Sequence, residues 1–308
     1  MKVVVVGCGA LGSLLAFKMI KAGIALTVLQ RGGVQYEALK AGGILFVDRE
    51  GKKERVPCEV VKTLDGLEMA ELAIVTVKAY QTEAAAWALR GNLAEDGVAL
   101  TLQNGLGNAE ILAGTFGAER VAAGTCTYGV HRRGPGEIAW GGDGMVRLGP
   151  WKAGRDLSPV EALLKKAGID VRLESDPRRA LWEKVILNAA VNPVSALTRL
   201  KNGILLESPV ARALVFQLVE EGVQAARSAG ETVETEQMQG LVRSVLEKTA
   251  ENRTSMLQDI ENGRKTEADA ILGKLVEIAR EKGKELVRTQ TVHALIKAIE
   301  NASERVRQ

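Results

Sequence analysis

The chain has 308 residues, of which 46% are hydrophobic and 26% charged, the balance of an ordinary globular protein of about two domains. The formal net charge is only +3 and Lys and Arg do not cluster, so no nucleic-acid partner is expected. Cys8, Cys58 and Cys126 are odd in number and far apart, which signals neither a disulfide framework nor a metal site and fits a reducing cytoplasm. No segment approaches the roughly 18 apolar residues that span a membrane, so no membrane partner is expected either.

The first half of the chain alternates predicted strands and helices. Short apolar runs, typical of buried parallel strands, lie at 2–6, 25–30, 72–77 and 98–103, and a helical spacing of leucines covers 10–22. Strands that alternate with helices predict a parallel sheet wound by right-handed crossovers.

Glycine-rich short strands fill 121–149, with turn signals at Gly134-Pro135-Gly136 and Gly141-Gly142. They predict β-hairpins that close one edge of the sheet, and a last strand follows at 169–173.

Beyond about 176 the sequence is helical to its end, with breaks expected near Asn192-Pro193, Ser208-Pro209, Gly230 and Gly263. We therefore predict an α/β protein with two domains. An N-terminal Rossmann-type doubly wound sheet covers residues 1–175, and an all-helical C-terminal domain covers 176–308.

A G-x-G-x-x-G motif lies directly after the first predicted strand and opens the first helix. The first glycine permits a tight turn, the second lets backbone approach a pyrophosphate, and the third lets helix and strand pack closely. The helix N-terminus offers free N–H groups to the phosphates. In this position the motif predicts dinucleotide binding rather than a mere turn. Its residues are Gly7, Cys8, Gly9, Ala10, Leu11 and Gly12.

The end of the second predicted strand carries Gln30 and Arg31, where an NAD site usually has an acid for the ribose 2′-hydroxyl. A guanidinium holds a 2′-phosphate that a carboxylate would repel, so the sequence predicts NADP(H) as the cofactor. The alternative is that Arg31 is a solvated surface residue.

Lys78 and Asn104 follow the third and fourth predicted strands. Ligands of open α/β sheets bind outside the carboxyl ends of strands, so we expect both side chains to face the nicotinamide half of the cofactor. Gly105 and Gly107 would let backbone approach a ligand there. The alternative for both polar residues is solubility at a strand end.

Two polar stripes mark the helical half. Lys184, Asn188 and Asn192 recur every four residues among apolar neighbours, which places them on one face of an otherwise buried helix. Asparagine is a poor interior helix residue, so the pattern indicates a polar cleft rather than an ordinary exposed face. A second, provisional stripe on one helix face consists of Asn252, Ser255, Asp259, Gly263 and Glu267.

Lys184 can supply both the proton and the positive charge that an alkoxide needs when hydride reaches a ketone carbon. Glu267 is a candidate to meet it in an interdomain cleft, with Lys78 and Asn104 facing Lys184. By spacing alone, Glu267 would more often be a surface acid.

The two histidines, His131 and His293, are expected to be structural or exposed, and no metal site is predicted.

These motifs occur together and in order, and they resemble the ketopantoate reductase (2-dehydropantoate 2-reductase) family over nearly the whole chain. The motifs at 183–193 and 252–271 are far more specific than the glycine motif. The residues that carry the resemblance are GCGALG at 7–12, Arg31, Lys78, QNGLG at 103–107, EKVILNAAVNP at 183–193 and NRTSMLQDIENGRKTEADAI at 252–271.

The resemblance implies NADPH-dependent reduction of 2-dehydropantoate, a branched small-molecule 2-oxo acid, to (R)-pantoate, a step toward pantothenate and coenzyme A. It implies that Lys184 is the catalytic acid and that Glu267 orients the substrate hydroxyl. It also implies that the substrate and nicotinamide are lined by Asn104, Asn188, Asn192, Asn202, Asn252 and Ser255.

Two departures from the family pattern leave room for a divergent substrate. Trp140 stands where a polar residue such as His is expected, and the usual proline is missing from LVRTQT at 286–291. The alternatives are a dehydrogenase of a different 2-oxo or 3-hydroxy acid on the same scaffold, or a non-catalytic dinucleotide-binding sensor. The oligomeric state is open, with a homodimer among the alternatives.

Overall fold

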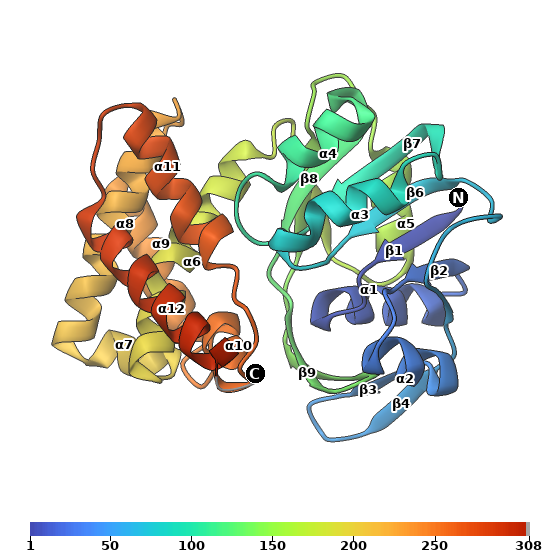
Figure 1. Cartoon of the computed structure of the whole chain (residues 1–308), viewed down its shortest axis with the longest axis horizontal. Helices are drawn as coiled ribbons and strands as arrows, with labels where there is room; N and C mark the ends of the chain where they lie inside the picture. Colours follow the sequence, from blue (N-terminus) through green and yellow to red (C-terminus); the bar gives the residue numbers. More distant parts are fainter. Residues whose placement is uncertain (306–308) are drawn as a thin grey trace. The chain divides into compact units, whose positions relative to one another are not determined.

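The computed structural model describes residues 1–305. The chain forms two compact units (Figure 1). Unit 1 comprises residues 1–103 and 108–178, and unit 2 comprises residues 104–107 and the chain from Arg179 onward.

The main sheet of unit 1 has eight strands in the order β12-β11-β8-β7-β6-β1-β2-β5. Neighbouring strands are parallel except β11, which runs antiparallel to β8. Apolar side chains of this sheet fill the core of unit 1. The strands are β1 (Val3–Val6), β2 (Leu26–Leu29), β5 (Glu59–Val61), β6 (Ala70–Val75), β7 (Leu93–Thr101), β8 (Val121–Cys126), β11 (Val146–Pro150) and β12 (Val171–Leu173).

The order in which the chain adds strands reverses between β1 and β6. From β1 the chain moves outward to β2, whereas β6, β7 and β8 follow one another in the opposite direction. Right-handed crossovers therefore place α1 (Ala10–Lys21) on one face of the sheet. They place α3 (Thr82–Leu89) and α4 (Asn108–Phe116), which pack side by side, on the other (Figure 1). Ligands of such sheets bind at the carboxyl ends of the strands where the order reverses.

A second sheet, with the order β4-β3-β10-β9, packs against α1. The sequence predicts that all hairpins of 121–149 lie at an edge of the main sheet. This is wrong for the β9–β10 hairpin, because β3 and β4, which were not predicted, offer it an edge. The predicted last strand does lie at the edge of the main sheet, as β12. The strands of the second sheet are β3 (Ile44–Val47), β4 (Lys53–Val56), β9 (Gly129–Gly134) and β10 (Glu137–Gly142). The other elements of unit 1 are α2 (Val34–Gly42), α5 (Ser158–Lys166) and the short 3₁₀ turns η1 (Ala79–Gln81) and η2 (Ala118–Arg120).

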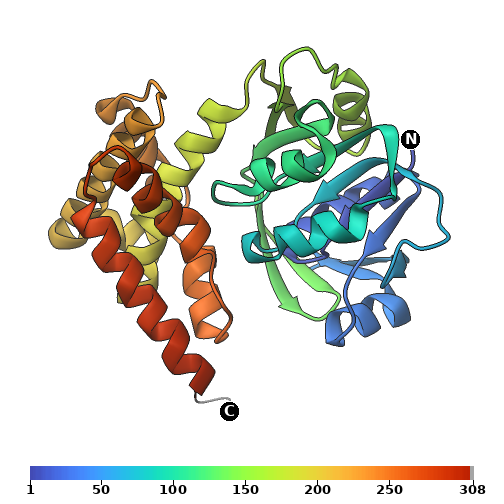
Figure 2. The same ribbon diagram turned by 45° about the horizontal axis from the view of Figure 1, so that its top comes forward.

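In the described part of unit 2, every regular element is helical (Figure 2). The central helix α8 packs against α7, α9, α11 and α12. Its Gly222 admits Ile186 of α6, since a Cβ there would lie 3.0 Å from the isoleucine Cγ2. The helices are α6 (Arg178–Thr198), α7 (Asn202–Glu207), α8 (Pro209–Ser228), α9 (Thr235–Lys248), α10 (Ser255–Glu261), the π-helical turn η3 (Asp269–Gly273), α11 (Lys274–Glu281) and α12 (Val287–Arg305).

The predicted fold class, a Rossmann-type parallel sheet followed by a helical region, is confirmed. Helices end at three of the predicted breaks, Ser208-Pro209, Gly230 and Gly263. The fourth is wrong, because the 21-residue helix α6 continues through Asn192-Pro193. Both residues are buried, and packing of the long helix offsets the cost of an interior proline, about 3 kcal/mol.

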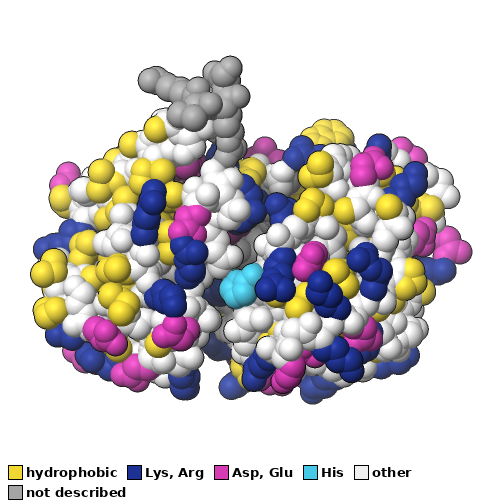
Figure 3. Space-filling view, turned by 90° about the horizontal axis from the view of Figure 1, so that it is seen from below, with side chains coloured by type: hydrophobic (Ala, Val, Ile, Leu, Met, Phe, Trp, Pro, Cys, Tyr) yellow, Lys and Arg dark blue, Asp and Glu magenta, His cyan; other side chains and the backbone are white. Residues whose placement is uncertain are grey.

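The charged side chains are mixed in sign. Figure 3 shows Lys and Arg interspersed with Asp and Glu over the face in view, in keeping with the formal net charge of +3. Among residues 1–305, no helix has the length and hydropathy needed to cross a membrane.

Candidate functional site

The glycine motif forms the turn from β1 into α1. Gly7 has a φ of +88°, and a Cβ there would lie 2.4 Å from Cγ1 of Val77. A Cβ on Gly12 would lie 2.1 Å from the Gly7 carbonyl oxygen and 2.5 Å from the Thr76 hydroxyl. A Cβ on Gly9, in contrast, would meet no described atom within 4 Å. Packing therefore requires the outer two glycines, whereas a ligand that approaches the backbone would account for the middle one.

Hydrogen bonds with two glutamines hold this turn. The Cys8 N–H donates to Gln30 Oε1 at 2.9 Å, and Gln35 Nε2 donates to the Cys8 carbonyl at 2.8 Å. Burial raises the pKa of the Cys8 thiol to about 12, although Ser13 hydrogen-bonds it at 3.2 Å. Cys8 thus contributes backbone and packing to the turn, and its thiol stays protonated at neutral pH.

The first turn of α1 is suited to an anion. Ala10 and Leu11 open the helix and are partly exposed, and this turn contains no acidic residue. The first N–H groups of a helix have no intrahelical acceptor and carry the positive end of its dipole. A phosphate at this turn would satisfy them.

Arg31 and Lys62 follow β2 and β5, which pair in parallel as neighbours. Arg31 is exposed. Lys62 Nζ would lie 3.8 Å from a Cβ on Gly32, and it sits 4.6 Å from the centre of the Tyr36 ring and 3.9 Å from Glu37 Oε1. The sequence gives no sign of Lys62, because its position beside the end of β2 follows from the register of β5, a strand that was not predicted.

A buried polar network holds the loop that carries Lys78, a half-buried residue between β6 and η1. Gln103 Nε2 donates to the Val77 carbonyl at 2.9 Å and to the Thr82 hydroxyl at 2.8 Å. The Thr82 hydroxyl lies 2.7 Å from Asn108 Oδ1. The network ties the loop after β6 to the end of β7. The network was not predicted. Its signal in the sequence is a glutamine at the end of an apolar run.

The loop after β7 belongs to unit 2 and meets Glu267 there. Asn104 Nδ2 donates to Glu267 Oε2 at 3.2 Å, and the Leu106 N–H donates to the Ala270 carbonyl at 3.0 Å. Gly105 has a φ of +86°, and a Cβ there would come within 2.6 Å of that carbonyl oxygen. The structure thus brings together two residues that are 163 positions apart.

The second predicted stripe does not form one helix face, and this prediction was wrong. Asn252 precedes α10, Ser255 is its first residue, and Gly263, with a φ of +57°, lies in the turn after it. Glu267 follows in an irregular segment just ahead of η3. A glycine in the left-handed region ends helices routinely, which explains the break.

Asn202 and Asn252 are nevertheless adjacent. The Asn202 N–H donates to the Asn252 carbonyl at 3.1 Å, and Asn202 Nδ2 donates to the Thr249 hydroxyl at 2.8 Å. Asn202 Oδ1 is buried and has no hydrogen-bond partner within residues 1–305. A buried acceptor without a partner is costly, so a ligand group that donates to it would be bound favourably.

The first predicted stripe lies on a continuous helix. Lys184 and Asn188 are half-buried and Asn192 is 6% exposed, and all three lie on α6 at intervals of four residues. They therefore share a face of that helix.

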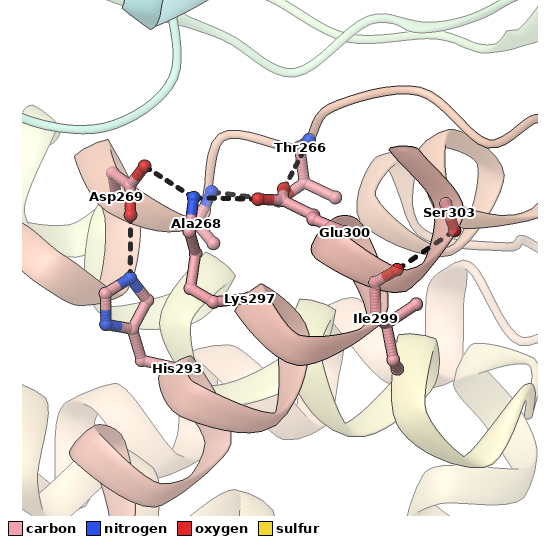
Figure 4. A network of polar contacts seen from close by, with 8 residues as sticks. All are labelled: Thr266, Ala268, Asp269, His293, Lys297, Ile299, Glu300 and Ser303. Carbon is pink, nitrogen blue, oxygen red and sulfur yellow. Dashed lines mark hydrogen bonds and ion pairs between the residues drawn. The ribbon is translucent and has the colours of Figure 1, made fainter. Parts of the chain in front are cut away.

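The two histidines lie in different units. His131 is half-buried in β9, whereas His293 Nε2 lies 2.9 Å from Asp269 Oδ1 on the surface of α12 (Figure 4). In the part of the chain that the structure describes, no group of three or more His, Cys, Asp or Glu could hold a metal ion.

Trp140 lines a cavity of about 650 Å³ beside the C-terminal half of α1. Its ring packs edge-on against Phe46, with centroids 6.1 Å apart, and Lys18 Nζ lies 5.7 Å from its centre. The described residues that line this cavity include none of the predicted site residues. The departure at Trp140 therefore concerns a separate surface.

The sheet with its glycine turn and the helical second unit define a class of dinucleotide-binding oxidoreductases, and comparison with known proteins identifies the family. The model of "Ketopantoate reductase PanE/ApbA" matches residues 3–153, and that of its C-terminal part matches residues 176–300. A 2-dehydropantoate 2-reductase of Halobacterium salinarum is 35% identical and covers 91% of this chain and 93% of its own. One of Archaeoglobus fulgidus is 33% identical over 97% and 98%. The chain belongs to the ketopantoate reductase family.

Solved structures show the same fold. A PanE/ApbA family ketopantoate reductase from Ralstonia eutropha superposes with a TM-score of 0.89 at 28% identity and covers 99% of this chain and 100% of its own. D-mandelate dehydrogenase with NADH and anilino(oxo)acetate gives a TM-score of 0.94 with the same coverage. At 21% identity the second likeness concerns the fold alone.

Proposed function

We propose that this protein catalyses the NADPH-dependent reduction of 2-dehydropantoate to (R)-pantoate, a step toward pantothenate and coenzyme A in the cytoplasm. The observation that carries the proposal is the match of both family models, together with relatives of that activity at 33–35% identity over more than nine-tenths of the chain. The lysine, the glutamate and the asparagines that the resemblance implies for the reaction are present in the sequence.

The NADPH-binding domain of the proposal is 1–175, and the substrate and catalytic domain is 176–308. The open space at Gly9 and the acid-free first turn of α1 support a pyrophosphate there. Arg31 and Lys62 support a 2′-phosphate, because two cations lie where an NAD site has an acid. The cofactor-binding residues of the proposal are Gly7, Cys8, Gly9, Ala10, Leu11, Gly12, Arg31, Lys62, Lys78 and Asn104.

Bound NADPH supplies a hydride to the ketone carbon of the substrate. In our proposal the Lys184 ammonium stabilises the negative charge that develops on the ketone oxygen during hydride transfer, and it then donates a proton to the resulting alkoxide. The lysine then regains a proton from solvent, so hydride and proton together complete the alcohol. Asn188 and Asn192, on the same face of α6, would orient the lysine and the substrate without adding charge.

Glu267 would accept a hydrogen bond from the substrate hydroxyl. Its buried carboxylate already accepts one from Asn104, which fixes the orientation of one oxygen. The unpaired Oδ1 of Asn202 would accept a second donor from the substrate. The substrate-binding residues of the proposal are Asn104, Lys184, Asn188, Asn192, Asn202, Asn252, Ser255 and Glu267.

The test is NADPH oxidation by the purified protein with a panel of branched and aromatic 2-oxo acids, each run again with NADH. We expect the highest kcat/KM with 2-dehydropantoate and NADPH. A higher value with another 2-oxo acid would assign the protein to a different dehydrogenase activity. NADPH binding without turnover of any acid would assign it to a sensor.

A further inference from the structure

Glu267 lies in a segment that no regular helix fixes. It follows the turn at Gly263 and precedes η3, a π-helical turn that begins at Asp269. π-helical turns are rare and are frequently found at functional sites. Glu267 is only 7% exposed. Besides the hydrogen bond from Asn104, its orientation depends on the contacts that hold the backbone on either side of it.

One face of α12 supplies these contacts (Figure 4). Glu300 Oε1 accepts a hydrogen bond from the Thr266 N–H at 2.7 Å, immediately before Glu267. Glu300 Oε2 lies 2.8 Å from Lys297 Nζ, which lies 2.9 Å from Asp269 Oδ2. His293 reaches the other oxygen of that carboxylate at 2.9 Å. His293, Lys297 and Glu300 are spaced by four and three residues, which places them on one helix face.

The contacts in this cluster favour the ionised forms of Asp269 and Lys297. Burial alone would raise the pKa of Asp269, but hydrogen bonds from Lys297 and His293 outweigh it and the pKa is lowered. Burial alone would lower the pKa of Lys297, but hydrogen bonds to Glu300 and Asp269 outweigh it and the pKa is raised. The buried Glu300 is therefore paired on both oxygens, as a buried carboxylate must be.

We propose that Glu300 is a positioning residue for Glu267. It holds the residue before Glu267 directly and, through Lys297, the second residue after it, so that the Glu267 carboxylate is presented to the substrate in one orientation. This inference rests on the proposed contact between Glu267 and the substrate hydroxyl.

If Glu300 had only a structural role, its loss would lower stability without changing KM. Glu221 of α8 provides the matched control for such a role. Glu221, like Glu300, is 7% exposed. It accepts hydrogen bonds from the Thr289 N–H and hydroxyl at the start of α12, both at 2.7 Å. Glu221 and Glu300 thus anchor backbone in the same unit, but only Glu300 does so beside Glu267.

Two variants of Glu300 separate the effect of side-chain length from that of charge. Glu300→Asp keeps the charge but withdraws the oxygen from Thr266, whereas Glu300→Gln keeps an oxygen that can accept the Thr266 N–H. We expect Glu300→Asp to raise KM for the 2-oxo acid on the order of tenfold, below the roughly 10²-fold cost of a 1 Å misplacement. We expect Glu300→Gln, which keeps the Thr266 contact but loses the acceptor for Lys297, to raise KM less than Glu300→Asp does. The dissociation constant of NADPH should be unchanged in both.

Lys297→Met removes the link to Asp269 and serves as a second variant, which decides the matter if Glu300→Asp does not fold. We expect it also to raise KM. Glu221→Asp should lower the melting temperature and leave KM unchanged. A wild-type KM in folded Glu300→Asp or in Lys297→Met overturns the inference, as does an equal rise in KM in Glu221→Asp.

Glu267→Gln, measured alongside, separates this inference from the proposed function. A raised KM in Glu267→Gln with unaltered KM in the Glu300 and Lys297 variants refutes the positioning role alone. An unaltered KM in Glu267→Gln refutes the substrate contact of Glu267 and the positioning role with it.

Discussion

At the residue scale, our proposal assigns the choice between NADPH and NADH to the residues at the ends of β2 and β5. Arg31→Ala should weaken NADPH binding roughly tenfold, the lower end of the about 1.5–3 kcal/mol of a charge-assisted contact, because Arg31 is exposed. NADH, which lacks the 2′-phosphate, should bind as before. Titration of both cofactors by protein fluorescence measures this. Lys62→Met should show the same selectivity with a smaller loss, since Glu37 partly offsets its charge. Equal losses for NADPH and NADH would mean that neither cation touches the 2′-phosphate.

Within the glycine turn, the structure separates glycines needed for packing from the one available to a ligand. Gly9→Ala should leave the melting temperature nearly unchanged, because the added methyl group meets no described atom. It should nevertheless weaken NADPH at least about tenfold, since the methyl group occupies the space of the pyrophosphate. Gly12→Ala is the contrast and should destabilise the fold, because its methyl group would overlap the Gly7 carbonyl. Unaltered NADPH affinity in folded Gly9→Ala would contradict the assignment of the phosphate site.

At the scale of elements, the contact between η3 and α12 makes the stability of the fold depend on pH. The pKa of Asp269 is lowered in the folded protein because the hydrogen bonds from Lys297 and His293 outweigh burial. A lowered carboxyl pKa stabilises the fold above the ordinary value of 3.8 and ceases to do so as pH falls through the folded value. Asp269→Asn should therefore lower the melting temperature at neutral pH, and the difference from wild type should shrink in acid. Asp65→Asn, at an exposed site of unit 1, is the control. A difference that stays constant with pH would exclude this ionic contribution.

Elements with strong local signals could be predicted from sequence, and elements that depend on partners could not. β1, the glycine turn and α1 follow from an apolar run, three spaced glycines and a helical period. β3 and β4 escaped prediction because β4, with the sequence KERV, is largely exposed and becomes a strand only by pairing with β3. The helix break expected at Pro193 fails for the converse reason, since packing along α6 overrides a local preference.

The same distinction holds for the candidate site. The stripe on α6 could be predicted because Lys184, Asn188 and Asn192 lie within one helix, where spacing fixes direction. The hydrogen bond from Asn104 to Glu267 and the contact of Glu300 with Thr266 join residues distant in sequence. Periodicity carries no information about such pairs. Even the resemblance to the family, which did pick out Asn104 and Glu267, gave no sign of Glu300.

For the whole molecule, the assignment of binding to one unit and proton transfer to the other can be tested with a single variant. The proposed phosphate contacts lie in unit 1, whereas Lys184 lies on α6 in unit 2. Lys184→Ala should lower kcat with 2-dehydropantoate by a factor on the order of 10²–10⁴, the range for a lost general acid. The dissociation constant of NADPH should change little.

The melting temperature of Lys184→Ala should also stay near the wild-type value, because the side chain is half-buried and its removal leaves the apolar core intact. Lys282→Ala, an exposed lysine after α11, serves as the matched control and should retain full turnover. If Lys184 were only a structural residue, its loss would lower the stability or have no effect on it, and kcat would stay near normal. Stability, cofactor affinity and turnover are measured on the same two proteins, so a loss of folding or of cofactor binding is distinguished from a loss of chemistry. A near-normal kcat in folded Lys184→Ala would mean that another residue or water donates the proton.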